Sequence, residues 1–160
     1  MSYKVVYEFD PFEETSLNAP EKKSSRRDAL KEIAEYVRDE LLQYYGDGES
    51  PVSRGKWKSK LSSEYAKLKE EISGVDFANM ELYGDMLDSL EYKITGNKIQ
   101  IGWFGGEEGA KAYGHQTGYD GHPTIKKGPV RQLLPNEGER LRPDIREGMK
   151  QIAKEFIQED

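Results

Sequence analysis

The chain has 160 residues, of which 34% are charged and 11% aromatic, a composition that fits one polar but folded domain over residues 1–160. Because it has no Cys, the sequence excludes disulfides, cysteine-bound zinc and thiol nucleophiles, and its net charge of −6 disfavours a general nucleic-acid binder. Without a long apolar run or an export signal at the N-terminus, we expect a soluble intracellular protein with no membrane segment.

The first predicted elements are a strand and a long helix. Residues 3–9 alternate between apolar and polar side chains, which predicts a strand that Asp10-Pro11 ends. The polar residues 10–24 are expected to form a flexible loop. Residues 25–45 predict a helix, with Ser25 and Asp28 resembling a capping box and Gly46 placed to end it. Its apolar stripe is Leu30, Ile33, Val37, Leu41 and Tyr44.

The middle of the chain changes from a helical to a strand pattern. Residues 46–60 form a Gly-, Pro- and Lys-rich connector, and residues 62–73 predict a shorter helix. One or two helical turns follow at residues 82–88. Two alternating runs, residues 90–95 and 98–103, then flank Gly96-Asn97, which is a typical β-hairpin signal.

The last third predicts two helices and a strand. Residues 107–114 fit a short helix, residues 115–128 a flexible Gly- and Pro-rich loop, and residues 130–134 a strand. The final helix begins near Pro143, a favoured first helical position. It is expected to bury Ile145, Met149, Ile152 and Phe156. Together these elements predict an α+β domain, in which long helices pack on a small, mainly antiparallel β-sheet containing a hairpin near residues 90–103.

Charge is sorted into two adjacent blocks. Residues 50–69 contain six Lys and Arg against Glu64 alone, a balance of +5, and residues 70–91 contain seven Asp and Glu with no base, a balance of −7. The blocks can be two solvated faces of one subunit. They can also be complementary edges that meet in an oligomer, because opposite potentials steer and register such contacts.

The basic block includes a run of four basic side chains around an aromatic one, at residues 54–60. Phosphates and a stacked base are one set of ligands for such a run. The acidic block beside it interrupts any continuous nucleic-acid groove. The pattern therefore favours docking on an acidic protein surface, through Lys56, Trp57, Lys58 and Lys60.

The glycines after the hairpin lie where a phosphate-binding loop would lie, after a strand and before a helix. Their spacing matches no dinucleotide or P-loop motif, and Glu107 and Glu108 would repel a phosphate at the start of the helix. We therefore expect a flexible loop. The glycines are Gly102, Gly105, Gly106 and Gly109.

Two imidazoles and a carboxylate, from His115, Asp120 and His122, offer a ligand set for a divalent metal. They lie in a segment expected to be loop, where packing or hydrogen bonding is the usual role of a histidine. No Gly-x-Ser-x-Gly elbow is present to supply a nucleophile. We expect no enzymatic activity and no cofactor, and we keep a metal-dependent hydrolase as the alternative.

Five short motifs, in order, resemble the virion morphogenesis proteins of tailed phages. The Lys-rich residues 50–69 come first, and residues 82–90 resemble a Gly-x-Leu-x-x-Ser turn, with Met86 in place of Leu. Residues 99–102 resemble a short strand that ends in Gly. Residues 112–118 resemble a Tyr-Ala…His-Gln-x-Gly segment, with Gly114 for Ala, and residues 129–135 resemble a Pro-x-Arg-x-Phe-Leu strand, with Leu133 for the aromatic residue.

The resemblance implies a structural protein of the phage neck or tail end, of the head–tail joining, tail-completion or tail-terminator type. Such proteins form sixfold or twelvefold rings that join the capsid connector to the tail. The implied partners are further copies of the chain, head–tail connector or adaptor proteins, and a tail terminator or tail-tube protein. Genomic DNA would only pass through the channel, and no membrane is involved. The protein would reside in the virion, and in the host cytoplasm during assembly.

Ring formation requires that one surface of a subunit meets a different surface of the next, and the two charge blocks would suit such contacts. Arg131 has two readings: a surface charge on an edge strand, or a bidentate partner of a carboxylate within or between subunits. A small adaptor that binds one acidic protein without forming a ring is a further alternative. The expected interaction residues are Lys56, Trp57, Lys58, Lys60, Gly84, Met86, Ser89, His115, Gln116, Gly118, Pro129, Arg131 and Pro135.

Overall fold

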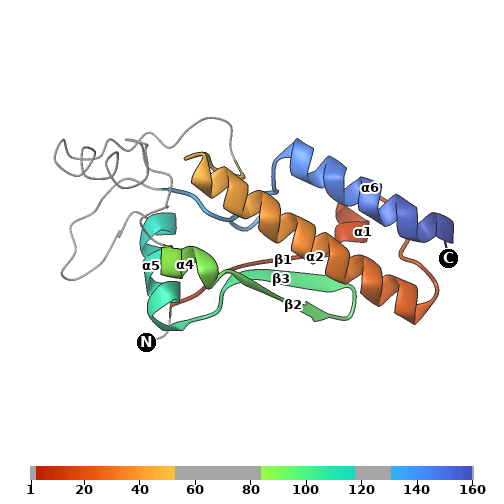
Figure 1. Cartoon of the computed structure of the whole chain (residues 1–160), viewed down its shortest axis with the longest axis horizontal. Helices are drawn as coiled ribbons and strands as arrows, with labels where there is room; N and C mark the ends of the chain where they lie inside the picture. The colour runs from red at the N-terminus through yellow and green to blue at the C-terminus, as the bar shows by residue number, and fades with distance from the viewer. Residues whose placement is uncertain (1–2, 53–83, 118–130, 160) are drawn as a thin grey trace.

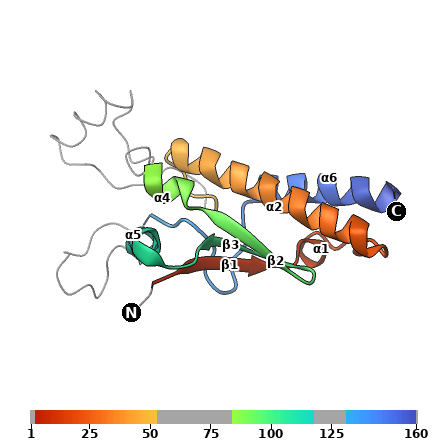
Figure 2. The same ribbon diagram turned by 60° about the horizontal axis from the view of Figure 1, so that its bottom comes forward.

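Two long helices pack on one face of a three-stranded antiparallel sheet (Figures 1 and 2), which confirms the α+β fold. The computed structural model describes residues 3–52, 84–117 and 131–159. The strand order is β1-β3-β2, and Gly96-Asn97 joins β2 to β3 as the predicted hairpin. The strands are β1 (Val5–Phe9), β2 (Glu91–Thr95) and β3 (Lys98–Trp103).

The alternation of side chains separates the two faces of the sheet. Tyr7 and Ile101 are paired across β1 and β3 and are both buried on the helix side. On the opposite face Glu8 pairs with Gln100, whose Nε2 donates to the carboxylate at 2.7 Å, and Lys98 Nζ lies 3.4 Å from it. An apolar inner face and a charged outer face are typical of an antiparallel sheet with one solvated side.

Helix α2 (Lys23–Gly46) crosses the inner face of the sheet. The expected capping box is wrong: the helix begins two residues earlier, Lys22 is its N-cap, and no side chain caps it. At the other end Gly46 is still helical. It is the last helical residue, and Asp47 is the C-cap. Gly48 (φ 71°) and Glu49 then donate their N–H groups to the carbonyls of Tyr45 and Tyr44, a Schellman motif that favours glycine. The apolar stripe is as expected except that Tyr45, rather than Tyr44, is fully buried.

Helix α6 (Pro143–Glu159) lies beside α2. Ile145 and Met149 are fully buried, as predicted, whereas Ile152 and Phe156 are half-buried. The expected loop over residues 10–24 is wrong in part, because it contains helix α1 (Pro11–Glu14) and the start of α2. The Asp10 carboxylate caps α1 by accepting from the N–H groups of the residues at the second and third helical positions.

Two shorter helices complete the domain at the far end of the sheet. They are α4 (Gly84–Asp88) and α5 (Gly106–Thr117), and both were expected. Glu107 and Glu108 occupy the first turn of α5, where they complement the helix dipole. The flexible loop expected at the glycines after the hairpin is wrong. Gly102 is paired within β3, where a Cβ would lie 2.0 Å from the Val5 carbonyl oxygen. Gly109 is buried inside α5.

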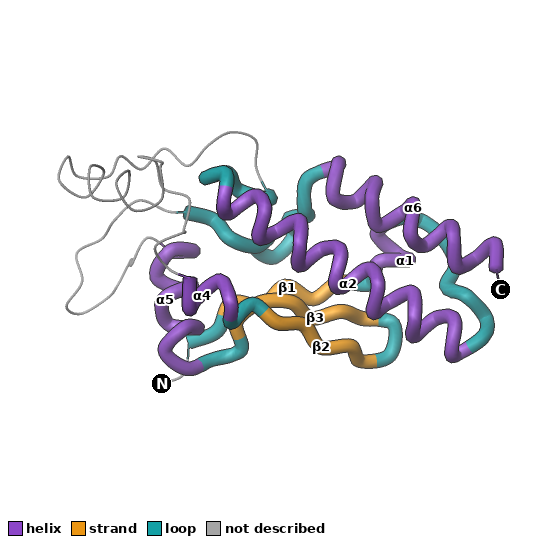
Figure 3. The backbone as a smooth tube through the Cα atoms, viewed as in Figure 1, coloured by secondary structure: helices purple, strands orange, loops and turns teal. Residues whose placement is uncertain are grey.

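The strand expected at residues 130–134 is absent from its described part. Residues 131–142 run as an irregular connection to α6 (Figure 3), although Leu133 and Leu134 are buried. Their backbone groups bind a side chain of α5 in place of a neighbouring strand, which satisfies buried amides without a sheet ladder. The predicted helix at residues 62–73 and the basic block beyond residue 52 lie outside the described residues.

Candidate functional site

The C-terminal end of α5 holds the segment that leads to α6. Arg131 donates its backbone N–H to the carbonyl of His115 at 2.8 Å, and its guanidinium Nη1 lies 3.3 Å from His115 Nδ1. Gln116 Oε1 accepts the N–H of Leu133 at 2.7 Å and that of Leu134 at 3.2 Å, and its Nε2 donates to the Leu134 carbonyl at 2.8 Å. His115 and Gln116 are called the α5 clamp below.

Helical spacing explains why His115 faces inward. Ala112 and His115 are three residues apart, so they share the buried face of α5. The last turn is closed by Thr117, whose hydroxyl donates to the Tyr113 carbonyl at 2.8 Å. From α2, the buried Tyr45 hydroxyl donates to the Leu133 carbonyl at 2.6 Å. The clamped segment is therefore bonded to both α5 and α2.

The charge state of His115 is set by its surroundings. The residue is 2% exposed, and burial, with a smaller contribution from the Arg131 charge, lowers the pKa of its imidazole to about 4. A guanidinium only donates hydrogen bonds, so Nδ1 has to be the acceptor. His115 is therefore neutral at neutral pH.

These surroundings bear on the metal site considered for His115, Asp120 and His122. His115 lies on helix α5 rather than in a loop, and a cationic guanidinium faces its Nδ1, which disfavours a second cation at that nitrogen. Asp120 and His122 lie outside the described residues. Within the described ranges, no group of three or more His, Asp or Glu side chains could hold a metal ion.

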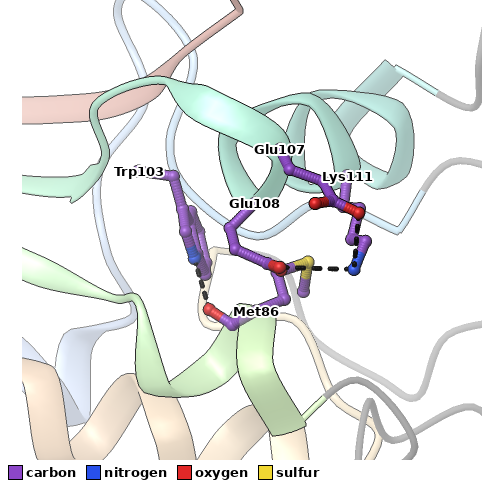
Figure 4. Close-up of polar contacts among 5 residues, drawn as sticks. All are labelled: Met86, Trp103, Glu107, Glu108 and Lys111. Carbon is purple, nitrogen blue, oxygen red and sulfur yellow. Dashed lines mark hydrogen bonds and ion pairs between the residues drawn. The ribbon is translucent and has the colours of Figure 1, made fainter.

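A second junction joins α4 to the end of the sheet (Figure 4). The Trp103 indole Nε1 donates to the Met86 carbonyl at 2.6 Å, and the backbone N–H of Ser89 donates to the same oxygen at 3.2 Å. Met86 is fully buried, so a flexible apolar side chain fills this part of the core. The next turn is fixed from α2, because Arg38 Nε donates to the Leu90 carbonyl at 2.8 Å.

An acidic group lies against this junction. Lys111 Nζ is 3.3 Å from Glu108 Oε1 and 3.9 Å from Glu107 Oε1, and Figure 4 shows the Glu108 carboxylate pointing toward Met86. Among the described residues, the second oxygen of Glu108 is buried without a hydrogen-bond partner. The pairing with Lys111 offsets part of the cost of burying this carboxylate.

The described interaction residues contribute to internal packing. Met86 and Pro135 are buried, the former against Trp103, and Gly84 begins α4. Arg131 is half-buried; it is on no strand, and its guanidinium contacts an imidazole. The remaining interaction residues lie outside the described part of the chain: Lys56, Trp57, Lys58, Lys60, Gly118 and Pro129.

Three residues of these junctions were missed from the sequence: Arg38, Tyr45 and Trp103. A buried Trp or Tyr usually finds a partner for its N–H or O–H group, so Trp103 at the end of an apolar run signalled a hydrogen bond. Its acceptor, a backbone carbonyl seventeen residues away, has no sequence signal.

Comparison with known proteins adds no relative. No protein-family model, curated protein or solved structure matches the chain. Over the described residues, every helix is too short or too polar to cross a membrane.

Proposed function

We propose that the chain is a structural subunit of a ring at the neck or tail end of a tailed phage, joining the capsid connector to the tail. It acts by assembly and without catalysis. The proposal rests on the ordered resemblance of five short motifs to virion morphogenesis proteins. One observation supports it: Gln116 of one motif binds Leu133 and Leu134 of another, and at the same end of the sheet Trp103, which follows the motif strand, binds Met86 of a third.

The contacts give those residue types a shared purpose. The turn containing Met86 accepts a hydrogen bond from Trp103, which follows the motif strand, and Gln116 binds Leu133 and Leu134 from the last motif. Motifs that meet in space are expected when they preserve one structural unit, as in a family that shares a fold and varies its surfaces.

Electron microscopy and native mass measurement test the proposal. A monomer of this length has a radius of gyration near ~15 Å, so a ring is readily distinguished. We expect rings from the purified protein alone or on addition of a connector or tail-tube protein. A chain that stays monomeric under both conditions contradicts the proposal, and a one-to-one complex with a single acidic protein would favour the adaptor.

A further inference from the structure

A groove with a basic rim runs between the start of α2 and the outer edge of β2. It has a volume of about 660 Å³. Its apolar lining comes from Leu30, Tyr92 and Ile94, of which Leu30 is fully buried and the others half-buried. Its rim carries four cations and, among the described residues, no carboxylate. This basic groove is rimmed by Lys23, Arg26, Arg27 and Lys31.

Three of these cations are available to a partner. Lys23, Arg27 and Lys31 are exposed and make no ion pair with any described residue, whereas Arg26 Nη1 donates to the Pro20 carbonyl at 3.2 Å. The position of Lys23, in the first turn of α2, is unfavourable for an isolated subunit. The first turn of α2 contains no acid, and the positive end of the helix dipole repels cations. An anionic partner would offset this repulsion.

A second groove of about 620 Å³ lies at the opposite edge of the sheet, between β1, α1 and residues 135–140. Six carboxylates line it against two cations, Lys98 and Arg140. Glu13 and Glu137 are exposed and form no ion pair within the described ranges. The carboxylates of this acidic groove are Glu8, Asp10, Glu13, Glu14, Glu137 and Glu139.

We propose that the basic groove of one copy docks on the acidic groove of a second copy of this chain. The inference rests on the proposed ring and names its interface. Because β1 and β2 are the two edges of one sheet, the contact is heterologous. A row of docked copies therefore leaves one groove unused at each end, basic at one end and acidic at the other. Successive contacts of this kind close into a ring when the rotation between copies allows it. Complementary charge supplies register and orientation.

Charge reversal tests the interface from both sides. Lys23→Glu with Arg27→Glu reverses the charge on the three available cations of the basic groove, from +3 to −1. Glu13→Lys with Glu137→Lys reverses the charge on the two unpaired acids of the acidic groove, from −2 to +2. Each pair is expected to raise the apparent dissociation constant for self-association roughly tenfold or more, measured by sedimentation velocity at low salt. All four changes in one chain, or an equimolar mixture of the two pairs, should restore association, because the reversed grooves are again complementary.

Matched controls separate this contact from a general effect of charge. Lys4→Glu with Lys154→Glu changes the net charge as much as the basic-groove pair does, on exposed residues that line neither groove. The basic-groove pair should leave the thermal midpoint unchanged or raise it, since it places acids at the start of α2. Lost association therefore cannot be attributed to unfolding.

The outcomes also separate the interface from the ring. Wild-type rings that persist in both reversed pairs overturn the interface and leave the proposed function standing. Charge-dependent pairing that neither closes into rings nor binds a connector or tail tube supports the interface and contradicts the function. Failure of the four-change chain to associate overturns the interface, as does a wild type that stays monomeric. Basic-groove reversal that abolishes retention of a DNA duplex without changing sedimentation assigns the groove to phosphates instead.

Discussion

Arg131 contacts His115 twice, through its backbone N–H at 2.8 Å and through its guanidinium at 3.3 Å from Nδ1. The side-chain contact requires a neutral imidazole. A proton on Nδ1 would place one donor against another and a positive charge against a positive charge. The link between α5 and the segment before α6 is therefore sensitive to acid.

Acid is expected to destabilise the fold through His115. Its pKa is lowered from 6.5 to about 4, so between these values the unfolded chain takes up a proton that the folded chain does not. The free energy of unfolding should fall by up to about 3 kcal/mol as the pH drops through this window. Urea unfolding of the wild type and His115→Gln over this range measures the effect. Parallel pH dependences of the two proteins would contradict it.

The Tyr7–Glu14 pair is expected to act in the opposite direction with pH. Burial raises the pKa of Glu14 above 4.5, and the Tyr7 hydroxyl, which donates to Oε1, opposes this rise. A raised carboxyl pKa stabilises the fold below 4.5 and loses that contribution as the pH rises through the folded value. Tyr7→Phe removes a hydrogen bond to the ionised form, so it should raise the Glu14 pKa further. We expect Tyr7→Phe to lower the free energy of unfolding in urea by about 1–3 kcal/mol at pH 7 and by less at pH 4.

A matched control for this change is available on β2. The Tyr92 hydroxyl donates to Glu35 at 3.1 Å in an exposed position. Tyr92→Phe is therefore expected to cost no more than about 0.5 kcal/mol. If Tyr7→Phe and Tyr92→Phe lower the free energy of unfolding equally, or if the effect of Tyr7→Phe does not depend on pH, burial of the Glu14 carboxyl is not the cause of that effect.

Gln116→Ala should weaken the fold more than a surface glutamine does. The substitution removes partners from buried backbone groups of Leu133 and Leu134, at a cost of about 2–3 kcal/mol. Gln151, which donates to Glu147 one turn away on the exposed face of α6, provides the control, and Gln151→Ala should cost about 0.5 kcal/mol or less. Comparable urea midpoints for the two variants would show that the α5 clamp contributes little to stability.

Gly102→Ala should disrupt the β1–β3 pairing. A Cβ would lie 2.0 Å from the Val5 carbonyl oxygen, at a backbone φ of 148°, so a loss of at least about 3 kcal/mol is expected. Gly46→Ala is the contrasting change. That glycine is the last residue of α2, with nothing within 4 Å of a Cβ, so alanine should stabilise the fold slightly, by no more than about 0.5 kcal/mol. If the thermal midpoints of Gly102→Ala and Gly46→Ala move in the same direction, the close approach of Gly102 to the Val5 carbonyl is contradicted.

The helices and strands that were predicted correctly are those that form because of a local periodic pattern. The alternation around Gly96-Asn97 gave the hairpin, and the stripe from Leu30 to Leu41 gave the long helix. The strand predicted at residues 130–134 is wrong in its described part because a distant partner decides its structure. Residues 131–134 have the composition of a strand, yet Gln116 of α5 satisfies their amides, and no local pattern announces that partner.

The candidate site was predicted less fully, for a related reason. His115, Gln116 and Arg131 were expected among the interaction residues, but their contacts with one segment of the same subunit were not predicted. The two grooves were missed altogether. Each groove combines segments that are distant in sequence, such as Lys31 with Ile94. The charged blocks that stand out in the sequence lie elsewhere, at residues 50–69 and 70–91.

The α5 clamp also has a consequence for length variation. Residues 117 and 131 are held close together by the hydrogen bond between the Arg131 N–H and the His115 carbonyl, so the chain between them begins and ends at nearly the same point. Doubling the length of such a closed segment costs only about 0.6 kcal/mol in closure entropy. Because its two ends are fixed this way, a chain lengthened between them should lose little stability to closure entropy, which urea unfolding of a variant with an inserted epitope would measure.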